Sequence, residues 1–145
     1  MLAVADGTVA AVLDGLPENV PDAKSYPVPM NLTNMGGNNV ILDIGEKQFA
    51  FYAHLQPHTI RVKVGDHVVR GQVLALVGNS GNATGPHLHF QLSDANSELG
   101  TEGLPFVIDS LQFVGKVSGE DFKPLAKPEH LERVLPLEDD VVQFP

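Results

Sequence analysis

The amino-acid sequence predicts an all-β fold, a small and mostly antiparallel β-sheet sandwich or open barrel with long loops around a groove. Fourteen glycines and eleven prolines punctuate the 145 residues. Between them lie short runs rich in β-branched and aromatic residues, as in the strands of all-β domains. The chain shows no long helical pattern and no internal repeat. We therefore expect one β domain over residues 1–117, followed by a Pro-rich, acidic tail over residues 118–145.

The first half of the chain is expected to contain three strands. Residues 7–13 (GTVAAVL) form the first. Residues 14–38 contain four prolines, which argue against a helix and predict a long connection of the kind that often walls a functional site. Residues 39–44 (NVILDI) form the next strand, Gly45 and Glu46 the turn, and residues 48–55 (QFAFYAHL) the returning strand.

The strand over residues 48–55 should have two different faces, because successive side chains of a strand point to opposite sides. His54 shares its side with Ala50 and Tyr52, so we expect it to point away from the more apolar side. That side consists of Phe49, Phe51, Ala53 and Leu55.

The second half of the chain continues the same alternation of short strands and glycine-rich turns. We expect the strands that bear the candidate histidines to form the floor of the groove, and the long loops to form its walls. The remaining elements, in order, are strands 60–64 and 72–77 joined by a turn over 65–71, a glycine-rich loop over 79–86, a strand over 87–92, a loop over 93–105, and a strand or hairpin over 106–117.

The residues with the strongest chemical signal are His87 and His89, which stand two positions apart in a predicted strand. Period two places both imidazoles on one face, where they could address a single metal ion or reacting group. The glycine-rich loop before them lets backbone approach a ligand closely. His54 is a third candidate on another strand, and a solvated pair of surface histidines is the alternative interpretation.

Other polar residues are explained by ordinary surface and turn chemistry. Three further histidines lie in turns or in the tail and are expected at the surface: His58, His67 and His130. Four aspartates lie at strand ends or turns and are not expected to be ligands: Asp6, Asp14, Asp43 and Asp66.

Composition excludes several classes of function. Nine basic and 18 acidic residues give a net charge of −9, which disfavours nucleic-acid binding. No apolar run is long enough to span a bilayer, so we expect no membrane insertion. The absence of cysteine excludes disulfides, thiolate nucleophiles and cysteine-ligated metals. The first twenty residues contain no Lys or Arg, which is unlike a signal peptide.

A family resemblance covers nearly two thirds of the chain. The segments that carry it are 3–9 (AVADGTV), 38–40 (NNV), 52–55 (YAHL), 62–68 (VKVGDHV), 70–72 (RGQ), 77–81 (VGNSG) and 84–90 (TGPHLHF). In this order and spacing they resemble the core of the lysostaphin-type zinc metallopeptidases, which cut peptide bonds in bacterial cell-wall peptidoglycan. The resemblance implies that His89 binds zinc, and that His54 and His87 act on the peptide as general base, general acid or oxyanion stabiliser. It also implies a location in the cell envelope or outside the cell.

The sequence departs from the family pattern at its start. The family takes two more zinc ligands, a histidine and an aspartate, from a segment just before the AVADG stretch, whereas this chain opens at Met1 and Leu2. We therefore expect an incomplete zinc site, from a truncated sequence or a domain that has lost catalysis. A substitute site made of His54, His87 and His89 would divert both proton shuttles into ligation and should be weak.

Three functions are thus compared. The first is a zinc-dependent endopeptidase of cell-wall peptides. The second is a catalytically inactive domain of the same fold that binds cell-wall peptide or regulates another hydrolase. The third is a biotinyl- or lipoyl-type carrier, which residues 62–77 also resemble, but Lys47 and Lys63 lack the flanking residues of a carrier hairpin.

Overall fold

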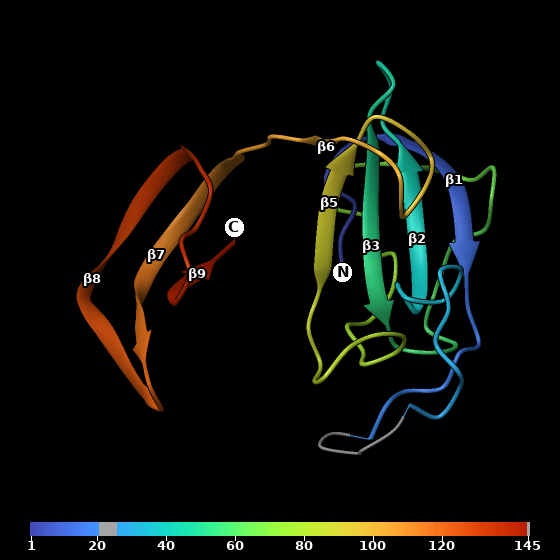
Figure 1. The fold of residues 1–145 in the computed structure, drawn as a ribbon. Helices are drawn as coiled ribbons and strands as arrows, with labels where there is room; N and C mark the ends of the chain where they lie inside the picture. Colours follow the sequence, from blue (N-terminus) through green and yellow to red (C-terminus); the bar gives the residue numbers. More distant parts are fainter. Residues whose placement is uncertain (21–25, 145) are drawn as a thin grey trace. The chain divides into compact units, whose positions relative to one another are not determined.

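The computed structural model describes residues 1–20 and 26–144, and the chain divides into two compact units, Met1–Leu104 and Pro105–Pro145 (Figure 1). Within the described residues, all regular structure is β, and every named strand pair is antiparallel. The prediction of an all-β, antiparallel fold is therefore confirmed. No helix able to cross a membrane occurs in the described part of the chain.

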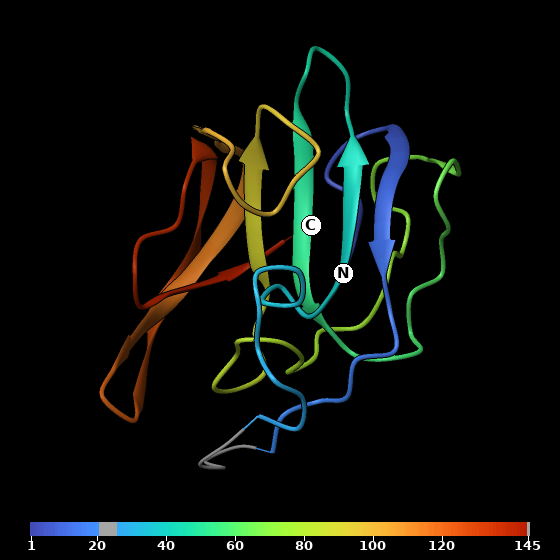
Figure 2. The ribbon, with the colours of Figure 1, turned by 45° about the vertical axis from the view of Figure 1, so that its right-hand side comes forward.

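The first unit is built on a six-stranded sheet with the order β4-β1-β2-β3-β5-β6. Its central strands lie side by side in Figures 1 and 2. The order makes β3 the neighbour of both β2 and β5, so the two histidine-bearing strands of the prediction are adjacent. The strands are β1 Gly7–Leu13, β2 Asn38–Asp43, β3 Phe49–Leu55, β4 His67–Val68, β5 His89–Ser93 and β6 Gly103–Leu104.

The two faces of this sheet are packed differently. One face carries the main core, where Tyr52 and Leu42 are at most 1% exposed. Residues from the N-terminus and from the segment 60–75 cover this face. The opposite face has a smaller apolar cluster of Ile41, Phe51 and Ala53. This second face carries the candidate histidines.

The segment 60–77 differs from its prediction as two strands. It forms only the two-residue β4 and isolated contacts, such as the bridge between Leu2 and Val73 and the 2.8 Å hydrogen bond from Arg61 N to Leu74 O. A tight turn at Gly65, where φ is +90°, interrupts the run. Some of its apolar side chains, among them Val62, Val68 and Leu74, instead cover the main core, which requires no continuous ladder.

The second unit is a three-stranded antiparallel sheet with the order β8-β7-β9. Its strands are β7 Ile108–Ser118, β8 Asp121–Val134 and β9 Asp140–Gln143. The predicted boundary at residue 117 therefore falls inside β7, and residues after it form strands where a tail was expected. The prolines are accommodated because β8 is an edge strand, where a missing N–H need not break a ladder.

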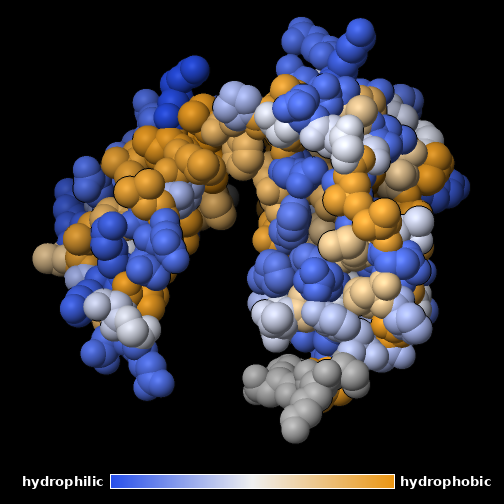
Figure 3. Space-filling model, viewed as in Figure 1, coloured by the Kyte–Doolittle hydropathy of each residue, from blue (hydrophilic) through white to orange (hydrophobic). Residues whose placement is uncertain are grey.

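Few side chains of the second unit are buried. Leu111 is 1% exposed, whereas Phe122 and Leu137 are 50% and 72% exposed. Figure 3 shows apolar and hydrophilic side chains mixed over its visible surface. Lys116 Nζ lies 2.9 Å from Asp140 Oδ1, and this hydrogen bond holds the pKa of the Asp140 carboxyl below its usual range. Polar contacts thus tie β9 to the central strand of the unit.

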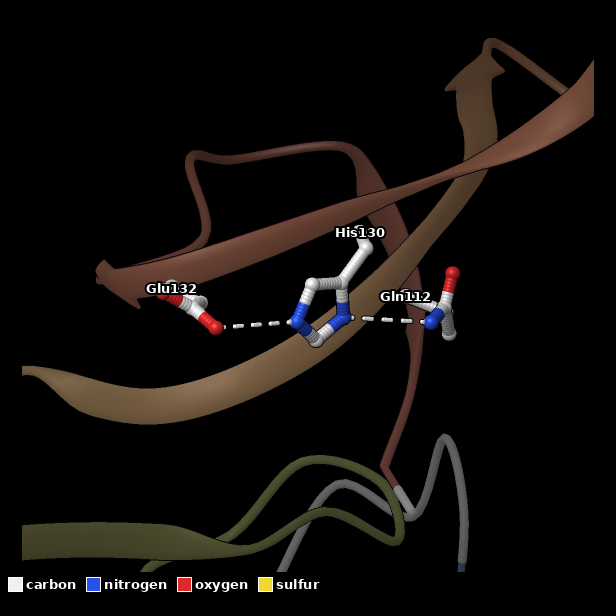
Figure 4. A network of polar contacts seen from close by, with 3 residues as sticks. All are labelled: Gln112, His130 and Glu132. Carbon is white, nitrogen blue, oxygen red and sulfur yellow. Dashed lines mark hydrogen bonds and ion pairs between the residues drawn. The ribbon is translucent and has the colours of Figure 1, made fainter.

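His130 belongs to a surface network in this second unit (Figure 4). Its Nδ1 lies 3.2 Å from Gln112 Nε2, and its Nε2 lies 3.3 Å from Glu132 Oε1. Both contacts are exposed to solvent, as the sequence predicted for this histidine. The network links β7 to β8 through side chains, in addition to the backbone ladder between the two strands.

Candidate active site

His54 is placed by a β-bulge near the end of β3. Asn38 pairs with Leu55 while Val40 pairs with Tyr52, so two residues of β3 oppose the single residue Asn39. His54 has φ +59°, in the left-handed region, which costs about 1 kcal/mol for a residue with a side chain. Its N–H donates to Gly36 O at 2.8 Å.

The bulge reverses the face that simple alternation assigned to His54. Leu55 lies with Tyr52 in the main core although the two are three residues apart. His54 instead lines the same pocket as Phe51. The prediction that His54 lies opposite Phe51 was therefore wrong, because alternation fails wherever an extra residue enters a strand.

The ring of His54 is held by the glycine-rich loop before β5. His54 is 5% exposed, and its Nδ1 donates to Ser80 O at 2.8 Å. Ser80 is fixed in turn, because its Oγ accepts from Asn38 N at 2.9 Å and donates to Leu55 O at 2.8 Å. These contacts leave Nε2 as the nitrogen of His54 with a free lone pair.

His87 and His89 reach the same face from the start of β5. His89 begins the strand and pairs with Ala53, whereas His87 lies just before it and forms an isolated bridge with Gly78. The ring centroid of His54 lies 4.7 Å from that of His87 and 5.8 Å from that of His89. The structure thus brings together the three histidines that the sequence singled out.

The tautomers of the exposed pair follow from their hydrogen bonds. His87 Nδ1 lies 2.9 Å from Gly85 O and must donate to it, which leaves Nε2 free. His89 Nε2 lies 3.0 Å from Gln91 Oε1, which leaves its Nδ1 free when the amide oxygen accepts. Each histidine of the cluster therefore offers one lone pair to a ligand or a proton.

Burial controls the charge of His54. Desolvation lowers the pKa of its imidazole below the ordinary value, and the neighbouring His87 and His89 lower it further. The bond to Ser80 acts in the opposite direction but does not reverse the shift. His54 is therefore neutral near pH 7 and can accept a proton at Nε2.

A pocket of about 190 Å³ lies over this face of the sheet. His54, His89 and Gln91 come from the sheet, and Phe51 forms its apolar floor. As predicted, the long loops form its walls, each of the three contributing residues. The wall residues are Met35 and Gly36 from the first loop, Asn82 from the second, and Glu98 and Leu99 from the third.

Glu98 is the pocket residue that sequence reasoning missed. It lies in a loop predicted only as a wall, and nothing in its sequence context distinguishes it from Glu102 or Asp94. Its place in the pocket depends on the packing of this loop against Gly36, which the sequence does not show. Of the three candidate histidines, His54 and His89 line the pocket and His87 does not. His58 and His67 also lie outside the lining, as expected.

The zinc site that the family resemblance implies needs several protein ligands close together. Across residues 1–20 and 26–144, no group of three or more His, Cys, Asp or Glu side chains is arranged to hold a metal ion. A catalytic zinc site normally uses three protein ligands and a water. The described residues therefore do not form a complete zinc site, and the three-histidine substitute is not formed either.

The antiparallel sheet and its clustered histidines agree with the lysostaphin-type peptidase domain that the sequence motifs predict. The chain belongs to Peptidase family M23, whose profile matches residues 1–100. Two relatives illustrate the similarity: peptidoglycan DD-endopeptidase ShyA of Vibrio cholerae, 46% identical over 56 residues, and lysostaphin of Staphylococcus simulans, 34% identical over 79 residues. These matches cover 39% and 52% of this chain but only 13% and 16% of those proteins.

A solved structure supports the same assignment. The catalytic domain of the prophage-encoded M23 protein EnpA from Enterococcus faecalis, crystallised as a mutant, aligns with a TM-score of 0.51 and 26% identity. The alignment covers 70% of this chain and 64% of that one. The fold and the family assignment therefore agree.

Proposed function

We propose that this chain is a peptidase domain that hydrolyses peptide bonds of bacterial peptidoglycan. The observation that carries the proposal is the histidine cluster: His54 and His89 line one pocket, and the ring centroid of His87 lies 4.7 Å from that of His54. Proton transfer during hydrolysis needs imidazoles with free lone pairs. A domain that only binds peptide has no physical need for three of them side by side. Peptidoglycan as the substrate implies a place of action in the cell envelope or outside the cell.

The environments of the histidines support a proposed role for each. His54, buried and neutral, is the general base that accepts a proton at Nε2. His87 is exposed on the same face, and its Nε2 is free to contact the reacting carbonyl or the leaving amine. Ser80 and Gly85 carbonyl oxygens fix both rings, so neither has to reorient when substrate binds.

His89 is proposed as the metal ligand of this chain. Its Nδ1 is free, and Gln91 holds the other ring nitrogen, which is how a ligating imidazole is usually oriented. A bound zinc would polarise the scissile carbonyl. Because the described residues do not complete the site, further donors have to come from outside them, and the endopeptidase activity of the whole protein depends on those donors.

The second candidate is a catalytically inactive domain that binds cell-wall peptide or regulates another hydrolase. The observation that favours it is the lack of a three-donor group among the described side chains. The histidine cluster would then serve as a hydrogen-bonding surface for peptide. Both candidates are expected to bind cell-wall peptide, but only the first is expected to hydrolyse it.

The test compares histidine variants on purified peptidoglycan. We expect His54→Ala and His87→Ala to lower turnover about a hundredfold or more, while zinc content is unchanged. We expect His89→Ala to lower zinc content. His58→Ala and His67→Ala, which change histidines outside both the pocket lining and the cluster of three histidines, are the matched controls.

The outcomes separate the two candidates. Release of soluble peptides by the wild-type chain with zinc supports the enzyme. Binding of peptidoglycan by zinc-loaded protein with no release of peptides refutes it in favour of the inactive domain. Equal turnover in the His54→Ala variant and the His58→Ala control would refute the assigned base.

A further inference from the structure

Glu98 gives the pocket a charge that none of the roles above uses. Among the described residues that line the pocket, it is the one side chain with a formal charge at neutral pH, since the others are apolar, amide or histidine residues. The described lining includes no Lys or Arg to neutralise it. Burial raises the pKa of its carboxyl, with the Gly36 N–H and His89 acting in the opposite direction. The carboxylate is thus only partly solvated and has no fixed cationic partner in the described lining.

The position of the carboxylate is fixed by backbone. Gly36 N–H donates to it, and a Cβ placed on Gly36 would come within 2.8 Å of Glu98 Cδ and Oε2. A side chain at this position would displace the carboxylate from its present place. The same Gly36 accepts the N–H of His54 at 2.8 Å through its carbonyl. Gly36 therefore contacts Glu98 through its N–H and His54 through its carbonyl.

The surroundings of Glu98 define what it could bind. Phe51 forms an apolar floor, and Met35 and Leu99 add apolar surface beside the carboxylate. Together these features suit a group with an alkyl body and a cationic end, whose hydrocarbon part packs while its charge meets a carboxylate. An anionic or purely apolar group would leave the carboxylate poorly solvated and unpaired.

We propose that Glu98 is a specificity residue that binds an alkylammonium group of the peptide substrate, next to the bond on which His54 acts. The proposal rests on the peptidase function proposed above and names the substrate class that this pocket selects. The ammonium comes from a lysine-like side chain or from a free peptide N-terminus. The two sources present the same chemistry to the pocket and are separated by the test.

The experiment measures peptide binding, so it does not depend on turnover. The probes are a short neutral-backbone peptide with one lysine, the same peptide acetylated at the lysine side chain, and the same peptide acetylated at the N-terminus. Dissociation constants are measured by calorimetry or NMR titration. We expect acetylation of the recognised amine to weaken binding about tenfold, as loss of a charge-assisted contact does. Added salt should reduce this difference.

Variants then assign the difference to the carboxylate. Glu98→Gln keeps an oxygen that can accept from Gly36 N–H but removes the charge, so it should bind the free and acetylated probes equally. Glu102→Gln removes a charge from an exposed position of the same loop and should keep the tenfold preference. The NMR signals of the His54 ring serve as the check that the bulge is intact.

Three results would overturn the proposal. One is equal binding of all probes by the wild-type chain, and another is no binding of any probe at millimolar concentration. The third is a Glu98→Gln variant that loses affinity for every probe alike and shifts the His54 signals, which would make Glu98 a support for Gly36. A chain that shows the Glu98-dependent preference but never cleaves peptidoglycan would uphold Glu98 as the ammonium-binding residue and refute the peptidase proposal.

Discussion

Replacing Ser80 by alanine tests how much the hydrogen bonds of its side chain, behind His54, contribute to the free energy of unfolding. Ser80 is fully buried, and its Oγ links Asn38 N–H to Leu55 O. Leu55 O keeps another donor in the variant, because Asn38 Nδ2 also donates to it at 3.1 Å. Asn38 N–H, in contrast, loses its partner in a fully buried position. A buried donor left unpaired costs about 1–3 kcal/mol, so we expect Ser80→Ala to lower the free energy of unfolding by about 2 kcal/mol.

The assay is urea denaturation followed by tyrosine fluorescence. The chain has no tryptophan and two tyrosines, Tyr26 and Tyr52, both in the first unit, so the signal reports the unit that contains the site. Ser97→Ala is the matched control: Ser97 Oγ also donates to a backbone carbonyl, that of Leu99 at 2.8 Å, but in solvent. The control should change stability by less than about 0.5 kcal/mol.

The result also bears on the active site. Ser80 contacts His54 through its backbone carbonyl, which alanine retains, so the tautomer of His54 should not change. We expect a less stable protein with the same His54 ring signals. A Ser80→Ala variant as stable as Ser97→Ala would refute the assignment of the Asn38 N–H to Ser80.

Further predictions concern the charge and the backbone of the site. His54 should titrate below the ordinary histidine value when its ring protons are followed by NMR. Because the pKa of His54 is lowered in the folded state, the unfolded chain binds the extra proton first, so stability should fall as pH drops from about 6.5 towards the folded pKa. A His54→Gln variant should lose this part of the pH dependence. Titration of His54 at the ordinary histidine value would contradict the burial argument. Gly81→Ala should lower stability by about 3 kcal/mol or prevent folding, since Gly81 has φ +72° and its Cβ would lie 2.3 Å from Gly37 N. Gly45→Ala, at φ +89° with nothing within 4 Å, should cost only the ~1 kcal/mol of the backbone conformation; equal effects at the two glycines would show that the contact with Gly37 is not close-packed.

Much of the sheet could be predicted because its signals are local. The strand Gly7–Leu13 was predicted with its observed bounds, and the strands at β2, β3 and β5 within two residues at either end. Alternation along β5 placed His89 opposite Phe90, and the structure agrees, since Phe90 packs against the main core. The segment 60–77 was misjudged because its apolar residues cover a core without forming a ladder, and pattern alone does not distinguish the two arrangements.

The sequence by itself determined the fold class, the family and the three candidate histidines. This was possible because strand periodicity and the GPHLHF and YAHL motifs are local properties of neighbouring residues. Tertiary structure decided which way His54 faces and which residue completes the pocket. The bulge at His54 is stabilised by Gly36, Asn38 and Ser80, which are distant along the chain. Glu98 becomes a pocket residue only because its loop packs on Gly36. These contacts join residues that are distant along the chain, so no local sequence pattern predicts them.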